Sequence, residues 1–175
     1  MLPARKHDRI TASLVVLVMC ALLAPGCGKK AEEKGAEKMM EKALSEATGK
    51  ETTVDLQKEG DVHIENKDMQ VDITSTSTWP ADMFPEVPKF DAGAIERVVT
   101  SNEGGVKKFN IYFNDIKDGA VKQYAETLKA KAWDVNQMQM GDGGMLNAQK
   151  GKLGVTFAYS TKDKKDGMLA VFSTQ

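Results

Sequence analysis

The chain has 175 residues and a formal net charge of −1, with 24 basic and 25 acidic side chains. This balance argues against nucleic acid as a partner, because proteins that bind nucleic acid concentrate positive charge. The length suits one ordinary domain or two small ones.

The first residues have the pattern of an export signal. A basic start precedes a run over residues 12–24 that is apolar apart from Ser13, and small residues come directly before Cys27. The thirteen residues of this run would extend about 20 Å as a helix, against about 30 Å of bilayer hydrocarbon, so the run is too short to cross a membrane. We therefore predict a signal peptide over residues 1–26.

Cys27 is the predicted site of lipid attachment. The segment resembles the signal peptides of bacterial lipoproteins, in which the cysteine after a four-residue lipobox is acylated and becomes the new N-terminus. Leu23 and Gly26 match that pattern, whereas Pro25 is unusual in it. Ordinary cleavage with release and an uncleaved anchor are the two alternatives. Several acyl chains would hold the protein firmly at a membrane, since each buried CH₂ contributes about 0.8 kcal/mol.

Removal of the signal changes the chemistry that the chain can perform. Cys20 lies inside the signal, so the mature chain has Cys27 alone and no internal disulfide is possible. His63 is likewise the only histidine left. The remaining 149 residues contain 21 basic and 24 acidic side chains, a net charge of about −3.

Residues 27–49 are predicted to form a lipid-anchored tether and a helix. Lys, Glu, Ala and Gly dominate the start, and apolar residues then recur at helical spacing until Gly49, a plausible stop. We expect the helix over about residues 31–47. A disordered tether is the alternative for its first eight residues.

Residues 50–74 are predicted to form a three-stranded β-meander. Apolar residues occur at every second position in three short runs separated by polar turns: Val54 and Leu56; Val62 and Ile64; Met69, Val71 and Ile73. Because a sheet of this size is not stable alone in water, we expect the preceding helix to cover its apolar face.

Residues 75–92 are interpreted as a proline-rich linker between two modules. Its three prolines exclude a continuous helix or a central strand. Trp79, Phe84 and Phe90 either pack the modules together, which we favour, or form an exposed surface that contacts a partner.

Residues 93–175 are predicted to form an α+β module with a ββαβββ-like order, and a fourth closing strand after the helix is the alternative. Two alternating runs flank a glycine-rich turn, and a helical stripe of apolar residues runs from Val121 to Ala132, with Asp115 or Asp118 as its cap and an end near Trp133. Strand-like segments follow at 134–140, 145–150, 152–160 and 167–174. The expected fold class is α+β, with one helix covering an antiparallel sheet.

The motifs along the chain resemble a group of uncharacterised bacterial envelope lipoproteins. They are Glu-Lys-Met-Met-Glu-Lys-Ala-Leu at 37–44, the short meander, Trp-Pro-x-Asp-x-x-Pro at 79–85, the positions Tyr124, Leu128 and Trp133, and Ala-Gln-Lys at 148–150. Many members have glycine where this chain has Ala132. The resemblance implies an envelope lipoprotein of α+β fold and supplies no catalytic residue.

The most specific chemical hypothesis is a metal or acid/base site around His63. Asp61 and Glu65 share its side of one strand, and Asp55 and Asp72 lie on the flanking strands. Same-face neighbours are about 6.6 Å apart, so a metal site would need a carboxylate from a neighbouring strand. A solvated sheet face is the favoured interpretation, and we expect no tight Zn²⁺ site.

No other pattern indicates catalysis or a cofactor. The mature chain has neither a Gly-x-Ser-x-Gly elbow nor a Ser-x-x-Lys motif, and His63 alone would have to serve as a base. The glycines at 141–144 lack the spacing of a phosphate-binding loop. The lysines at 162–165 alternate with aspartates, as at a solvated hairpin tip.

These observations predict a non-enzymatic, lipid-anchored envelope protein that binds a partner, such as another envelope protein, or contributes to envelope structure. A protein that binds or handles a small ligand, with the sheet and helix of the last module as its pocket, is the alternative, and an enzyme is the third. By the sorting pattern of enteric-type lipoproteins, Gly28 implies delivery to the outer membrane, facing the periplasm, in a source with two membranes.

Overall fold

The computed structural model describes residues 30–57, 60–162 and 165–173. The predicted signal peptide and Cys27 lie outside these residues. Two compact units divide the chain, one up to Thr52 and one from Thr53 onward.

The first unit contains helix α2 (Lys30–Thr48), which begins and ends within one residue of the prediction. Gly49 adopts a left-handed conformation with φ of 68°, and its N–H donates to Ser45 O at 2.9 Å. The Thr48 hydroxyl donates to Leu44 O at 2.7 Å. Glycine ends the helix here because it carries no Cβ to oppose positive φ. That this helix covers the meander stays a prediction.

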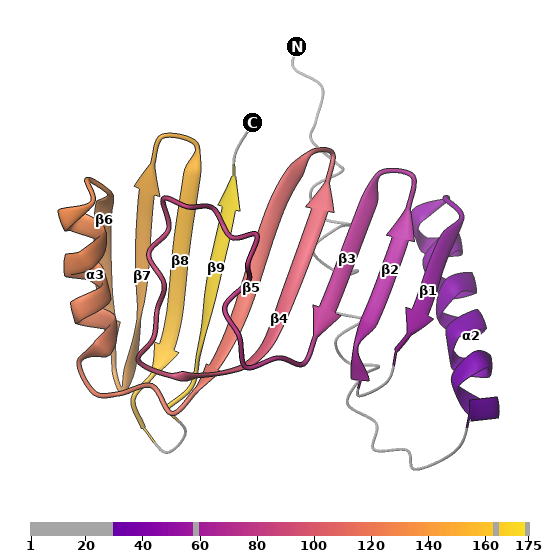
Figure 1. Ribbon diagram of the computed structural model, residues 1–175, viewed down its shortest axis with the longest axis horizontal. Coiled ribbons are helices and arrows are strands. Elements are labelled where there is room, and N and C mark those ends of the chain that lie inside the picture. The colour runs from indigo at the N-terminus through magenta and orange to yellow at the C-terminus, as the bar shows by residue number, and fades with distance from the viewer. Residues whose placement is uncertain (1–29, 58–59, 163–164, 174–175) are drawn as a thin grey trace. The chain divides into compact units, whose positions relative to one another are not determined.

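The sheet contains nine strands joined in the order β1-β2-β3-β4-β5-β9-β8-β7-β6, as Figure 1 shows. They are β1 (Thr52–Leu56), β2 (Val62–Asn66), β3 (Met69–Thr74), β4 (Ala94–Glu103), β5 (Val106–Asn114), β6 (Asp134–Met140), β7 (Gly143–Lys150), β8 (Leu153–Ser160) and β9 (Gly167–Ser173). Helix α3 (Ala120–Ala130) follows β5. The fold is therefore α+β and dominated by antiparallel sheet.

The proline-rich segment at 75–92 does not separate two sheets, which corrects the interpretation of it as a linker. Strand β3 pairs directly with β4, with Ile73 opposite Val99 and Asp72 opposite Thr100. The segment instead crosses in front of β5, β9, β8 and β7 (Figure 1). Strands predicted in separate modules thus belong to one sheet.

Phe90 is the main contact between this segment and the sheet. Its ring lies 4.8 Å from Phe157, 5.1 Å from Phe113 and 5.4 Å from Tyr124, measured between centroids and nearly perpendicular each time. The Tyr124 hydroxyl, on α3, donates to Pro88 O at 2.9 Å. The proline-rich segment and α3 therefore bury the same face of the sheet.

The buried apolar residues lie on one face of the sheet in its C-terminal strands and on the other face in its N-terminal strands. Register places Phe109 opposite Thr100 and Val171, so these three residues share the face that holds the main core. On β2 and β3 that same face carries polar residues, because Asp72 lies opposite Thr100 and His63 opposite Asp72. The buried apolar residues of the N-terminal strands lie on the other face: Val62, Ile73 and Val99.

Helix α3 ends at an alanine in a conformation that favours glycine. Ala132 has φ of 61°, and Trp133 N–H donates to Leu128 O at 3.1 Å, which is the Schellman arrangement. Glycine would adopt this conformation without the strain that the Cβ of alanine introduces. Ala132 is exposed, so it belongs to the cap and not to the buried helical stripe.

We expect Ala132→Gly to stabilise the protein by about 0.5–1 kcal/mol, because relief of left-handed strain exceeds the added entropy of the unfolded chain. Ala130→Gly is the matched control, since Ala130 is exposed in the last helical turn. It should destabilise by about 1 kcal/mol. Urea denaturation measures both, and a loss of stability in Ala132→Gly would contradict the cap geometry.

Candidate functional site

A groove of about 420 Å³ lies where α3 begins beside the sheet. Residues from the loop before α3, its first turn, β6 and the end of β8 line it: Ile116, Lys117, Gly119, Val121, Lys122, Gln137, Gln139, Tyr159 and Thr161. Its sheet wall belongs to the face that carries the main core, since Gln137 lies opposite the buried Leu146.

Backbone hydrogen bonds fix the loop that precedes α3. Ile116 N–H donates to Lys165 O at 2.8 Å, and Lys117 N–H donates to Ala92 O at 2.9 Å. Gly119 is the N-cap residue, with φ of 73°, and no side chain caps the helix. The expectation that Asp115 or Asp118 caps it is therefore wrong.

The structure shows why neither aspartate caps α3. Asp118 pairs with Lys165 at 3.0 Å, and Asp115 has a positive φ of 52°, which is unlike the extended backbone of a usual N-cap residue. The first turn of α3 contains no acidic residue. The positive end of the helix dipole thus faces the groove without a negative side chain from its own first turn.

A hydroxyl and two amides form the opposite wall. Gln137 Nε2 donates to Tyr159 Oη at 3.3 Å, and Tyr159 Oη donates to Gln139 Oε1 at 3.2 Å. Gly144 leaves room for this arrangement, because an added Cβ there would lie 2.7 Å from the Tyr159 hydroxyl. The wall therefore presents amide and hydroxyl groups that are hydrogen-bonded to one another.

Lys117 and Lys122 give the groove its charge. Both are exposed, and neither forms an ion pair with another of the described residues, whereas the nearby Lys162 and Lys165 pair with Asp142 and Asp118. A groove that joins these two ammonium groups to amide and hydroxyl groups is suited to an anionic ligand group.

The small-ligand alternative placed a pocket between the sheet and the helix of the last module, but the sequence did not identify the residues that line it. Neither lysine stands out in a chain rich in lysine, and nothing in the local pattern shows that β6 will lie beside the start of α3. One signal was present: Gln137 and Gln139 alternate with methionines in a strand beside the core. Polar residues on the core-facing side of an edge strand indicate a wetted site.

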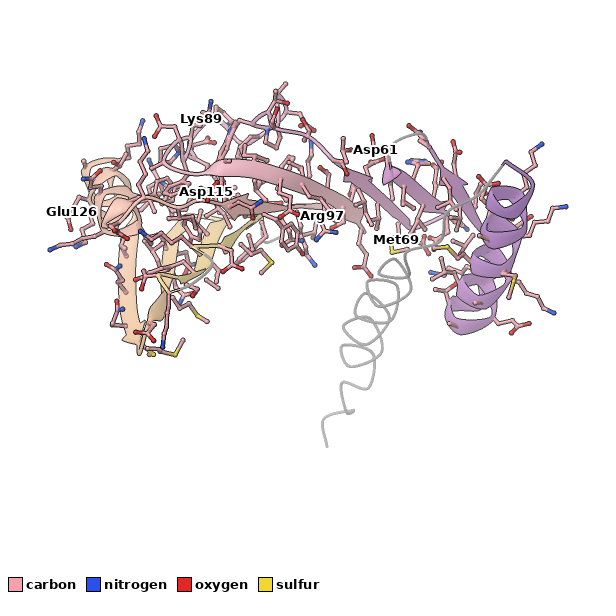
Figure 2. The ribbon with its side chains drawn as sticks, turned by 90° about the horizontal axis from the view of Figure 1, so that it is seen from below. Asp61, Met69, Lys89, Arg97, Asp115 and Glu126 are labelled. Atoms are coloured by element: carbon pink, nitrogen blue, oxygen red, sulfur yellow. The ribbon has the colours of Figure 1, made fainter. Side chains whose placement is uncertain are left out.

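His63 lies in a small polar cluster on the N-terminal strands. Its Nδ1 lies 2.5 Å from Asp72 Oδ1, directly across the β2–β3 ladder, and its Nε2 lies 3.6 Å from Glu65 Oε2. The hydrogen bond to Asp72 raises the pKa of His63 above its usual value of 6.5, although partial burial opposes this shift. In Figure 2, Asp61 is labelled near the same strands.

The carboxylates around His63 have other hydrogen-bond partners. Asp61 uses Oδ1 to accept the Ser75 N–H at 2.8 Å, and Gln70 Nε2 donates to Asp72 Oδ2 at 3.0 Å. In the described parts of the chain, no three His, Cys, Asp or Glu side chains come together as a metal could require. His63 is partly buried and contacts Asp72 across the β2–β3 ladder.

We expect His63→Gln to cost up to about 1 kcal/mol of stability at pH 6 and less at pH 9. A histidine whose folded pKa is raised stabilises the protein fully below 6.5 and loses this effect as the pH rises through the folded pKa. Urea denaturation at both pH values measures the difference. An equal cost at both would contradict the pairing with Asp72.

The aromatic residues proposed as partner contacts have different surroundings. Phe90 is only 3% exposed, so it cannot serve a partner, which corrects that assignment. Trp79 and Phe84 are partly buried and pack against the same core. Trp133, expected in the core, is buried, although its Nε1 has no hydrogen-bond partner among the described residues.

Among the described residues, no helix has the length and apolarity needed to cross a membrane. Comparison with known proteins gave no match: no family model, no curated protein and no solved structure is similar to this chain.

Proposed function

We propose that this protein is a non-enzymatic binding protein, held at a membrane surface by acylation of Cys27, that binds a ligand with an anionic group in the groove beside α3. The observation that carries the proposal is the lining of the groove: Lys117 and Lys122, which form no ion pair with another described residue, and amide and hydroxyl groups that are hydrogen-bonded to one another. It supports the small-ligand alternative more strongly than a contact surface built on Phe90.

The sequence supports the anchor. Cys27 follows a basic, then apolar, signal with small residues at its end, and Gly28 favours the outer membrane in a source with two membranes. The binding unit would then work at the envelope surface, facing the periplasm. Acylation also consumes the only thiol of the mature chain.

The lining of the groove supports binding over catalysis. Its described residues offer lysine ammonium, amide and hydroxyl groups but no carboxylate, imidazole or thiol. Such groups hold a negative charge well, and each charge-assisted hydrogen bond contributes about 1.5–3 kcal/mol where water is excluded. The groove is open, so we expect a smaller contribution from each lysine.

Titration of the full chain with inorganic phosphate and with succinate, followed by ¹H–¹⁵N NMR, tests the proposal. We expect the largest shifts at the amides of Gly119, Val121 and Gln139. Lys117→Gln and Lys122→Gln should each weaken binding about 3- to 10-fold, as loss of about 1 kcal/mol implies.

Lys108→Gln is the matched control for those variants. Lys108 is exposed on β5, and its sequence neighbour Phe109 points into the core, so Lys108 projects from the opposite face of the sheet. This variant should bind as tightly as the unchanged chain. Shifts spread evenly over all surface lysines would contradict a site in the groove.

A further inference from the structure

A row of methionines crosses the sheet on the face opposite α3 and the main core. Register places Met138 opposite Met145, Met145 opposite Ala158, Ala158 opposite Met168, and Met168 opposite Tyr112. These residues share one face, because directly paired residues project to the same side of a sheet. Met140, two residues after Met138, projects to that side as well.

Two of these methionines are unusually exposed. Met138 is 58% exposed and Met140 52%, whereas most methionines serve as flexible fillers of apolar cores, as the buried Met83 does. Met145 is half-buried beside them. A cluster of solvated thioethers at one end of a rigid sheet therefore needs an explanation other than packing.

We propose that Met138, Met140 and Met145 form a thioether site for a soft monovalent cation, of the class of Cu⁺ or Ag⁺. Thioether sulfur is a soft ligand that selects such cations over Zn²⁺, Mg²⁺ or Ca²⁺. This site uses none of the ligand types that the His63 cluster offers, and it lies on the opposite face of the sheet from the groove.

The spacing on the sheet permits three sulfurs to reach one ion. The Cα atoms of a cross-strand pair such as Met138 and Met145 are about 5 Å apart, and those of Met138 and Met140 about 6.6 Å. A methionine sulfur reaches roughly 4 Å from its Cα, and a metal–sulfur bond is about 2.3 Å. Met140 lies opposite Gly143, which has no side chain to cover it, and Met140 is itself 52% exposed.

The test uses the full chain, with Cys20→Ser and Cys27→Ser so that no thiol competes, labelled with ¹³C at the methionine methyl groups. Each methionine then gives one NMR signal, and Ag⁺ in chloride-free buffer is the probe because it needs no reductant. With one equivalent of Ag⁺, we expect the methyl signals of Met138, Met140 and Met145 to shift first and together.

Met39 provides the matched control, because it is 76% exposed on α2. Met138→Leu and Met145→Leu should weaken Ag⁺ binding at least about tenfold without unfolding the chain, since leucine has nearly the same volume. Met39→Leu should leave the affinity unchanged. The proposal is overturned if no methyl signal shifts, if Met39 shifts in parallel with the three, or if Met138→Leu binds Ag⁺ as tightly as the parent.

Discussion

Replacing Phe90 with alanine should lower the free energy of unfolding by about 3–5 kcal/mol, among the largest effects of any single substitution in this chain. Phe90 is 3% exposed and makes edge-to-face contacts with Phe113, Tyr124 and Phe157. The substitution removes a large apolar surface and leaves a cavity between the proline-rich segment, α3 and the sheet.

Urea denaturation of purified protein measures this loss. Phe84→Ala is the graded control, because Phe84 is only half-buried and has one aromatic neighbour, Phe109, at 5.8 Å. It should cost clearly less than Phe90→Ala. If Phe90→Ala cost under about 1 kcal/mol, the segment would not be docked on the sheet as the structure has it.

Leu128→Ala should cost about 2–5 kcal/mol, for a related reason. Leu128 is fully buried on the face of α3 that meets the sheet, together with Val121, Tyr124 and Ala125. Its carbonyl also accepts the Trp133 N–H that closes the helix. The side chain therefore holds in place the helix whose first turn forms one wall of the groove.

Lys129→Ala is the control on the solvent side of the same helix. Lys129 pairs with Glu126 at 2.9 Å across one turn, an exposed pair whose loss costs about 0.2–0.5 kcal/mol. Thermal and urea denaturation should separate the two variants by well over 1 kcal/mol. A Leu128→Ala protein as stable as Lys129→Ala would mean that α3 does not pack on the sheet.

Local pattern was sufficient to predict most of the secondary structure. Alternation of apolar residues located the strands, and Gly49 marked the end of α2 correctly. Such signals act over a few residues, so they do not depend on the rest of the fold.

The pairing of strands and the packing of the proline-rich segment were not predictable in the same way. The sequences of residues 69–74 and 94–103 do not indicate that these strands pair. The intervening prolines suggested that the two strands belong to different modules. The proline-rich segment also looked like a linker, because its aromatic residues carry no period that shows what they will cover. Phe90 finds its partners on β5, β8 and α3, contacts that only the assembled sheet provides.

The residues of the groove were not predictable either, because they come together only in the assembled sheet. The groove depends on the left-handed Gly119, on loop hydrogen bonds to Ala92 and Lys165, and on the register that brings Tyr159 across Gly144. His63 was recognisable from its strand, and its partner Asp72 was among the expected carboxylates. The alternation of charged residues could not show that Asp72 lies directly opposite His63.

Mass spectrometry of the N-terminal peptide from the membrane fraction tests the central claim, that this binding protein is held at a membrane through Cys27. The account predicts a peptide that begins at Cys27 and carries the added mass of acyl chains, with Cys27→Ala protein absent from that fraction. A peptide that begins at Cys27 or beyond without acyl mass, or an unchanged membrane fraction in Cys27→Ala, would contradict it.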